Sequence, residues 1–340
     1  MTAQPADRPG PPEAPPPPFE TDLPAPLPLV DLEPWDGVLE LRGRDQGLLV
    51  WGGAPAAEGP PSLGDRPVIV LLHGFLDQAG SWHDTAAALA GHGAVVLAPD
   101  HRGHGRSAWA GPGQHYAFAD YLADLDAIFD HFDLRGAVLV GHSMGGTMAA
   151  LYASLRPARV GALLLVDGLG PPALSDEDAY DTLLSFLDDQ RAPRAQAIGR
   201  PLPDLAAVEA RLRAIHPLRS AAAIQLMARR AVVPEPTGGH RWSADPMHKT
   251  RSAVAFDLRR FRVHLQRLRC PVRLVVGETG WYPQLPGLGR REAELPRWVG
   301  RHALPCSHHV PAELPGALAA LIARDWRRLI PPVPAEISVG

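Results

Sequence analysis

The chain reads Gly141-His142-Ser143-Met144-Gly145-Gly146 where an apolar run, residues 137–140, meets a helical pattern, residues 144–156. A G-x-S-x-G sequence between a strand and a helix is typical of a sharp turn that presents a serine hydroxyl at the edge of a parallel sheet. The glycines fit this turn because larger side chains there would collide with neighbouring backbone. The first N–H groups of the helix face the same space and favour negative charge there. A serine that only caps the helix is the alternative, and the strand before it and the helix after it favour the turn.

Short apolar runs alternate with helical patterns on both sides of this segment. The predicted strands are residues 38–42, 48–51, 68–72, 94–98, 137–140, 162–166 and 272–276. The predicted helices are residues 81–91, 119–132, 144–156, 253–267 and 312–329. Continuous apolar strands that alternate with helices indicate an α/β fold, with a mostly parallel sheet covered by helices on both faces. Functional groups in such sheets lie at the carboxyl ends of the strands.

The same pattern divides the chain into a tail, a core and an insertion. Residues 1–28 hold eleven of the 38 prolines, so we expect a disordered or polyproline II tail. A docking tail for a proline-binding partner is the alternative, although composition favours a plain extension. Residues 29–170 and 251–340 are predicted to form the core. Residues 171–250 are helical in pattern but repeatedly interrupted by proline, and we expect them to form a lid over the site.

Composition and charge exclude several classes of function. The formal net charge is −4 and no basic stripe is present, which argues against a nucleic-acid partner. Two cysteines are too few for a disulfide scaffold or a thiolate metal cluster. We find no signal-peptide pattern, and the apolar runs are too short to span a membrane. We therefore expect a cytoplasmic protein without a membrane span, acting on a small molecule; the sequence identifies no protein partner.

Two further segments make a family resemblance specific. His73-Gly74-Phe75 follows the predicted strand at 68–72, and Asp100-His101-Arg102-Gly103-His104-Gly105-Arg106-Ser107 follows the next strand. With the Ser143 segment, they resemble the α/β-hydrolase superfamily over roughly residues 35–330. The resemblance implies a sheet of about eight strands, a helical lid, a Ser–acid–His triad with Ser143 as nucleophile, and no cofactor. It also implies that the backbone N–H groups of Phe75 and Met144 form the oxyanion hole.

The histidines of residues 100–107 raise the question of a metal site. The loop lacks the neighbouring ligands that metal spacing requires, so we predict a structural role for it and no metal.

The general base is predicted near the C-terminus. Ser307-His308-His309-Val310-Pro311-Ala312-Glu313-Leu314-Pro315 resembles the family pattern Gly-His-x-x-x-x-Glu-x-Pro, with Ser307 where glycine is usual. This register makes His308 the base, and His309 is the alternative. Histidine suits the role because its pKa lies near neutral pH.

The triad acid departs from the commonest family pattern. Gly280 stands where an aspartate is usual, and Glu278 lies nearby. Asp167 ends the predicted strand at 162–166, 24 residues after Ser143. That spacing resembles the haloalkane-dehalogenase branch, whose nucleophile is aspartate. We predict Asp167 as the acid, with Glu278 or no acid as the alternatives.

These residues predict a serine hydrolase that cleaves an ester-like bond in a small molecule through an acyl-enzyme. Lactone, amide, thioester or carbon–carbon bond hydrolysis on the same fold is the first alternative. A ligand-binding member without catalysis is the second. Gly280 favours this non-catalytic alternative, whereas the Ser143 and His308 pair favours an enzyme.

Overall fold

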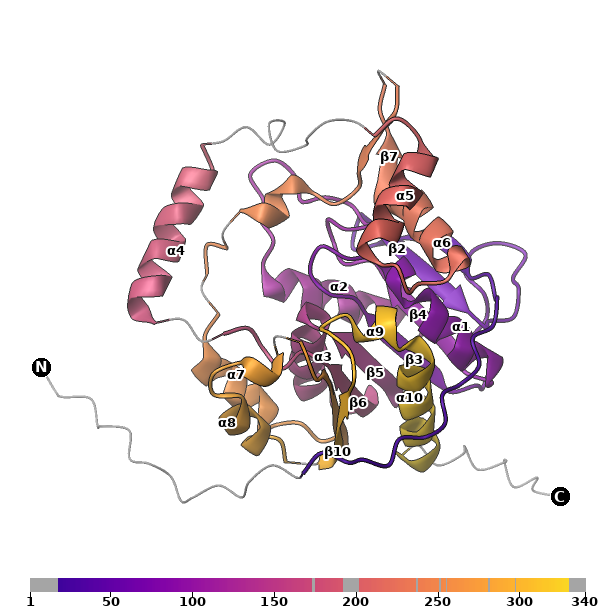
Figure 1. Cartoon of the computed structure of the whole chain (residues 1–340). Coiled ribbons are helices and arrows are strands. Elements are labelled where there is room, and N and C mark those ends of the chain that lie inside the picture. Colours follow the sequence, from indigo (N-terminus) through magenta and orange to yellow (C-terminus); the bar gives the residue numbers. More distant parts are fainter. Residues whose placement is uncertain are drawn as a thin grey trace, which may run out of the picture.

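The computed structural model describes residues 18–172, 175–191, 202–236, 238–250, 252–254, 256–280, 282–296 and 298–329. Its centre is an eight-stranded sheet in the order β1-β2-β4-β3-β5-β6-β9-β10 (Figure 1). All neighbours from β4 to β10 are parallel, whereas β1 pairs antiparallel with β2, and β2 with β4. The predicted fold class is confirmed. The strands are β1 Trp35–Leu41, β2 Arg44–Trp51, β3 Val68–Leu72, β4 Val95–Pro99, β5 Ala137–His142, β6 Val160–Val166, β9 Val272–Gly277 and β10 Trp298–Leu304.

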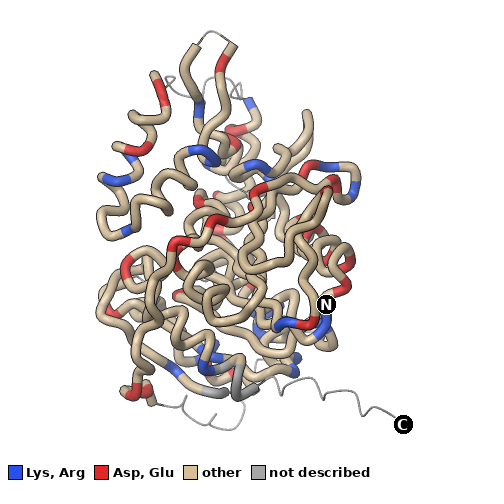
Figure 2. Tube along the Cα trace, turned by 90° about the vertical axis from the view of Figure 1, so that its right-hand side faces the viewer, with Lys and Arg blue, Asp and Glu red and all other residues tan. Residues whose placement is uncertain are grey.

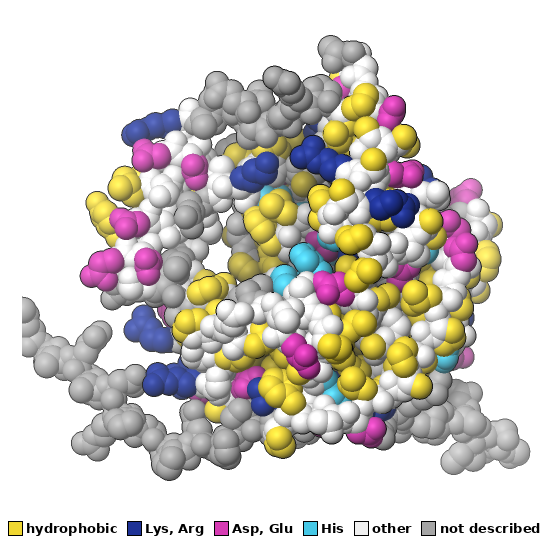
Figure 3. All heavy atoms as spheres, viewed as in Figure 1, with side chains coloured by type: hydrophobic (Ala, Val, Ile, Leu, Met, Phe, Trp, Pro, Cys, Tyr) yellow, Lys and Arg dark blue, Asp and Glu magenta, His cyan; other side chains and the backbone are white. Residues whose placement is uncertain are grey.

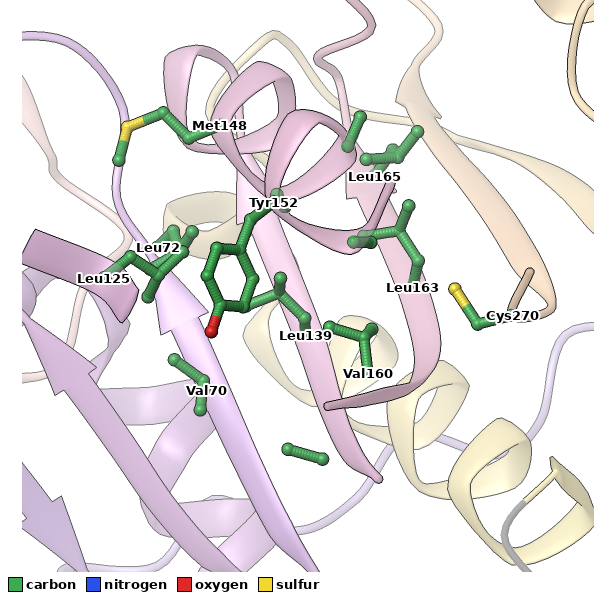
Figure 4. Packing of buried hydrophobic residues seen from close by; sticks show 14 of the residues in the cluster. Val70, Leu72, Leu125, Leu139, Met148, Tyr152, Val160, Leu163, Leu165 and Cys270 are labelled. Carbon is green, nitrogen blue, oxygen red and sulfur yellow. The ribbon is translucent and has the colours of Figure 1, made fainter. Parts of the chain in front are cut away.

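Alternate residues of the central strands enter two separate cores. Val70 and Leu139 share one core with helices α2, α3 and α7, and Figure 4 shows side chains of α3 packed over this face. Ile69 and Val138 share the other core with α1 and α10. This alternation follows from the two-residue period of a strand, and it covers both faces of the sheet. The helices of the core are α1 His83–Gly91, α2 Phe118–His131, α3 Met144–Leu155, α7 Leu258–Leu265, α8 Leu288–Ala293, α9 Val310–Glu313 and α10 Pro315–Leu329.

The strand β10 was not among the predicted strands. Its sequence carries Gly300, Arg301 and His302, which interrupt any apolar run. The structure compensates each polar side chain with a partner, since Arg301 donates to Glu292 at 2.8 Å and His302 receives hydrogen bonds from arginines. Such a strand shows no apolar periodicity in its sequence, because its polar side chains are paired with residues from other parts of the chain.

The predicted insertion contains more than helices. Between β6 and α7 the chain forms α4 Asp176–Asp189, α5 Leu205–Ile215 and α6 Ala221–Ala231, and then the hairpin β7 Val232–Pro234 with β8 His240–Trp242. In Figure 1, α4 stands apart on one side of the molecule, and α5 and α6 lie together on the other. The helices begin at side-chain caps, Ser175, Asp204 and Ser220, as the sequence chemistry favours. The assignment of residues 171–250 as a lid remains a prediction.

Helix α6 is fixed to the core by buried polar contacts. Arg230 of α6 is fully buried and donates hydrogen bonds to the buried Asp100 and to Asp36. Gln78 donates to the backbone oxygen of Met227 at 2.9 Å. Breaking a buried ion pair of this kind leaves an uncompensated charge, so this part of the insertion is held in place.

Residues 18–28 of the predicted tail contain no helix or strand, and they contact the core. The Glu20 N–H donates to the Arg301 oxygen at 2.6 Å, and the Leu27 N–H donates to the Gly316 oxygen at 3.0 Å. The Glu20 carboxylate lies 3.2 Å from Arg273 and 3.4 Å from Arg324. Proline content gave no sign of these contacts, because the basic partners lie about 250 to 300 residues away along the chain. Residues 1–17 of the predicted tail lie outside the described residues.

We expect Glu20→Ala to lower the free energy of unfolding by about 1–2 kcal/mol. The Arg273 side chain is only 3% exposed and would lose its contact with the Glu20 carboxylate, although the 37% exposure of Glu20 reduces the cost below that of a fully buried pair. The corresponding fall in Tm is roughly 2–6 °C. Glu58→Ala, at an exposed position after β2, is the matched control. A Tm equal to that of the control would contradict the proposed contact.

Basic and acidic residues are interspersed along the described part of the chain in Figure 2. Within the described part of the chain, no helix combines the length and the hydropathy needed to cross a membrane.

Candidate active site

Ser143 occupies a strained turn between β5 and α3. Its φ is 54° and its ψ is −115°, a combination that non-glycine residues rarely adopt. A Cβ atom at Gly141 would overlap the backbone oxygen of Gly145, and one at Gly145 would overlap that of Leu72. The two glycines of the motif therefore allow the turn to form. The Ser143 side chain makes no capping hydrogen bond to α3, which argues against a simple cap.

The structure brings His308 and Asp167 together. His308, in the loop between β10 and α9, is hydrogen-bonded through Nδ1 to Oδ2 of Asp167 at the end of β6. Asp167 is fully buried, and its Oδ1 accepts the Gly277 N–H at 3.1 Å. Both carboxylate oxygens are thus held in fixed positions. Glu278, the alternative acid, is exposed at the end of β9, where its N–H donates to the Leu304 oxygen at 2.9 Å.

Gly280 has no side chain, and this leaves room for the Asp167–His308 pair. A Cβ atom there would lie 3.0 Å from Oδ2 of Asp167 and 3.2 Å from the backbone nitrogen of His308. These distances are tighter than ordinary van der Waals contact, so a side chain at position 280 would crowd the Asp167–His308 pair. The glycine at the usual acid position is therefore compatible with an acid supplied from β6.

A second histidine, His142, supports the loop that carries His308. Its Nε2 lies 2.8 Å from the His308 backbone oxygen, and it can only donate to that oxygen. Burial, and then the nearby His308, lower the pKa of His142 to about 3, so the ring is neutral at pH 7. On the other side of the loop, Glu313 accepts the Ser307 N–H at 3.0 Å. Sequence reasoning gave His142 no role, although its place beside Ser143 was a usable signal.

The alternative base, His309, lies next to His308 but is more exposed. The two ring centroids are 5.6 Å apart. It is the His308 ring that contacts the buried Asp167 carboxylate. This arrangement favours His308 as the base.

The loop that carries Phe75 is held by histidines of residues 100–107. Leu76, which has a φ of 55°, donates its N–H to Nε2 of His104 at 3.2 Å. His73 Nε2 accepts the N–H of His101 at 2.9 Å. Burial lowers the pKa of His104 to about 3, which keeps its ring neutral and able to accept a hydrogen bond. These contacts fit the predicted structural role of the loop.

Phe75 and Met144, the predicted oxyanion-hole residues, line one cavity together with Ser143. Phe75 comes from the loop after β3 and Met144 from the first turn of α3. Their roles in binding an oxyanion remain predictions.

Comparison with known proteins gives the family. Residues 67–270 match the family model described as the alpha/beta hydrolase fold, which covers more than half of the chain. The chain is an α/β-hydrolase. It is therefore an enzyme of the hydrolase class, as the sequence predicted.

Individual relatives differ in how much of the α/β-hydrolase they match. A serine hydrolase-like protein of Danio rerio is 27% identical over 297 residues, which cover 85% of each chain. A monoacylglycerol lipase of Mycolicibacterium smegmatis is 34% identical over 130 residues, which cover 36% of this chain and 44% of the lipase. Among solved structures, a thioesterase domain from the curacin biosynthetic pathway aligns with a TM-score of 0.73 and 28% identity. The alignment covers 87% of this chain and all of that domain.

Two cavities of the α/β-hydrolase meet at the serine. One has a volume of about 460 Å³ and the other about 360 Å³, and Ser143 and Phe75 line both. Figure 3 shows histidine side chains at the bottom of a hollow between α4 and the α5–α6 segment. Volumes in this range suit a small-molecule substrate.

Proposed function

We propose that this α/β-hydrolase cleaves a carboxylic ester through an acyl-enzyme, with Ser143 as nucleophile, His308 as base and Asp167 as the acid. The observation that carries the proposal is the hydrogen bond between the buried Asp167 and Nδ1 of His308, in a fold that also holds Ser143 on a strained turn. A carboxylate on Nδ1 fixes the tautomer whose lone pair is on Nε2, which is the nitrogen that can accept a proton.

The reaction has two halves. Ser143 Oγ attacks the substrate carbonyl while His308 Nε2 takes the hydroxyl proton, and the N–H groups of Phe75 and Met144 stabilise the oxyanion. The imidazolium then gives its proton to the leaving oxygen, so an alcohol departs and an acyl-Ser143 ester remains. In the second half a water molecule, activated by His308, attacks this ester and releases the acid. Asp167 stays ionised and stabilises the imidazolium in both halves.

A thioester is the second candidate for the cleaved bond. Its support is the similarity to a thioesterase domain along that domain's whole length, whereas the similarity to the monoacylglycerol lipase supports an oxygen ester. Both bonds are cleaved by acyl transfer, and the same three side chains would serve.

Hydrolysis of a matched panel tests the proposal. Oxygen esters of acids with graded chain length, and the thioester, amide and lactone counterparts, would be incubated with the purified full chain. We expect turnover of at least one ester with kcat/KM in the usual enzymatic range, about 10⁴ M⁻¹s⁻¹ or more. Turnover of only the amide or the lactone, with every ester left intact, would contradict the proposal.

A further inference from the structure

The space in front of Ser143 consists of two chambers with different chemistry. We call the cavity of about 460 Å³ the aromatic chamber, because its walls include Tyr116, Phe118 and Tyr121 together with Met144 and Met247. We call the cavity of about 360 Å³ the histidine chamber, because four histidines line it: His142, His216, His308 and His309.

The position of the base assigns one part of the substrate to each chamber. His308 lines the histidine chamber but is not among the lining residues of the aromatic chamber. The imidazolium must lie within hydrogen-bond distance of the atom that leaves. The leaving alcohol therefore belongs on the His308 side of Ser143. The acyl group then extends into the aromatic chamber, and the water of the second half-reaction enters where the alcohol has left.

The described lining residues of the aromatic chamber include no Asp, Glu, Lys or Arg, and His115 and His248 are its histidines. Its main polar groups are already engaged. Tyr116 donates to Asp245 at 2.5 Å and accepts the Ala110 N–H at 3.0 Å. Thr147 accepts the Gly170 N–H at 3.2 Å. A carboxylate on the acyl group would have no lysine or arginine among these lining residues to pair with, and burying an unpaired charge is costly.

Six residues with rings line the aromatic chamber: Phe75, His115, Tyr116, Phe118, Tyr121 and His248. The rings of Tyr116 and His248 have centroids 3.9 Å apart, and Phe75 meets His248 edge-on at 6.0 Å. Such faces and edges pack well against another ring or a compact apolar group.

The histidine chamber adds hydrogen-bonding groups to a wall that also contains apolar residues such as Leu212, Met227 and Trp242. Burial, and then the nearby Arg219, lower the pKa of His216 to about 4, so this ring is neutral at pH 7. A neutral imidazole both donates and accepts, and Gln78 adds an amide. Asp77 is the carboxylate among the described residues that line the histidine chamber, and its negative charge repels an anion. The chamber therefore suits a polar leaving group that carries no negative charge near the cleaved bond.

We infer that the enzyme acts on esters of an uncharged acid with an aromatic or compact apolar group, and that the alcohol part is polar and not anionic. The inference rests on the proposed function, since it uses His308 as the proton donor to the leaving group. It goes beyond that function by naming the substrate class and by giving each chamber a role.

The test crosses two variants with two pairs of substrates. Met247→Trp narrows the aromatic chamber, and Ile215→Trp narrows the histidine chamber, which Ile215 lines. The acyl pair is 4-nitrophenyl 3-phenylpropanoate and 4-nitrophenyl acetate. The alcohol pair is the 2,3-dihydroxypropyl and methyl esters of 3-phenylpropanoic acid. Leu155→Trp, at an exposed position at the end of α3, is the matched control and should leave the kcat/KM ratio of each substrate pair unchanged.

We expect Met247→Trp to lower the kcat/KM ratio of the acyl pair at least tenfold and to change the ratio of the alcohol pair less than twofold. Ile215→Trp should show the opposite pattern. An overfilled pocket rejects the larger group by about this factor. Because each variant is compared with itself on two substrates, a general loss of stability does not produce the crossed pattern. A reversed pattern, or equal changes in both ratios, would overturn the assignment of the chambers.

The unmodified enzyme provides an independent arm. We expect 4-nitrophenyl hemisuccinate, whose acyl group carries a carboxylate, to be hydrolysed at least a hundredfold more slowly than 4-nitrophenyl pentanoate. Equal rates would overturn the inferred substrate class. Failure of the unmodified enzyme to cleave any ester would instead refute the proposed function, so the two failures are distinguishable.

Discussion

Ser143→Ala is expected to lower kcat for ester hydrolysis by about 10⁶, the scale of the loss when subtilisin loses its catalytic serine. Without the hydroxyl no acyl-enzyme can form, and the oxyanion hole alone contributes only a residual rate. The fold should survive, because alanine removes a single oxygen and the Ser143 side chain makes no capping bond to α3. The measurement is steady-state hydrolysis of the best ester of the panel, together with a thermal melt.

A matched control separates catalysis from folding. Ser154→Ala changes a serine within α3, whose hydroxyl donates to the Leu151 oxygen at 2.7 Å, and it should leave kcat within about twofold. Activity of Ser143→Ala within tenfold of the unmodified enzyme, after contaminating esterases have been removed, would refute the nucleophile.

Asp167→Asn is expected to lower kcat by about 10⁴, the scale of the aspartate-to-asparagine change in the serine-protease template. The amide oxygen can still accept the Gly277 N–H, so the side chain keeps one of its two contacts. Its NH₂ group then faces Nδ1 of His308 and favours the tautomer with the proton on Nε2, which cannot take the Ser143 proton.

Glu278→Gln is the comparison that decides between the two acids. Its side chain is exposed, so removal of its charge should lower kcat less than about tenfold. A loss of 10³ or more in Glu278→Gln, with Asp167→Asn nearly unaffected, would show that the acid is Glu278.

The fold and the Ser143 turn could be predicted because their determinants are local. Strands buried on both faces have continuous apolar sequences, and the turn requires Gly141 and Gly145 for steric reasons that hold in any such fold. Asp167 could be proposed because an aspartate was missing at position 280 and because Asp167 ends a strand 24 residues after Ser143. The three-dimensional reason, that a side chain at Gly280 would crowd the Asp167–His308 pair, cannot be read from spacing.

The features that the sequence did not predict depend on distant partners. Strand β10 contains Arg301 and His302, and the segment at residues 18–28 is rich in proline, so neither shows a periodic apolar pattern. Glu20 links this segment to β10. Its carboxylate and backbone lie in contact with residues of β9, β10 and α10. The division of the candidate active site into two chambers is also a tertiary property, since each wall combines residues of the predicted core with residues of the predicted insertion.

Labelling with a fluorophosphonate probe tests the central claim most directly, because the probe reacts with a serine that an adjacent base has activated. The full chain would be incubated with the probe, digested, and analysed by mass spectrometry of the peptides. We predict one adduct per chain, on Ser143, and loss of the adduct in His308→Ala. An unlabelled Ser143 in a folded chain that hydrolyses esters, or an adduct on another serine, would contradict the assignment of Ser143 and His308.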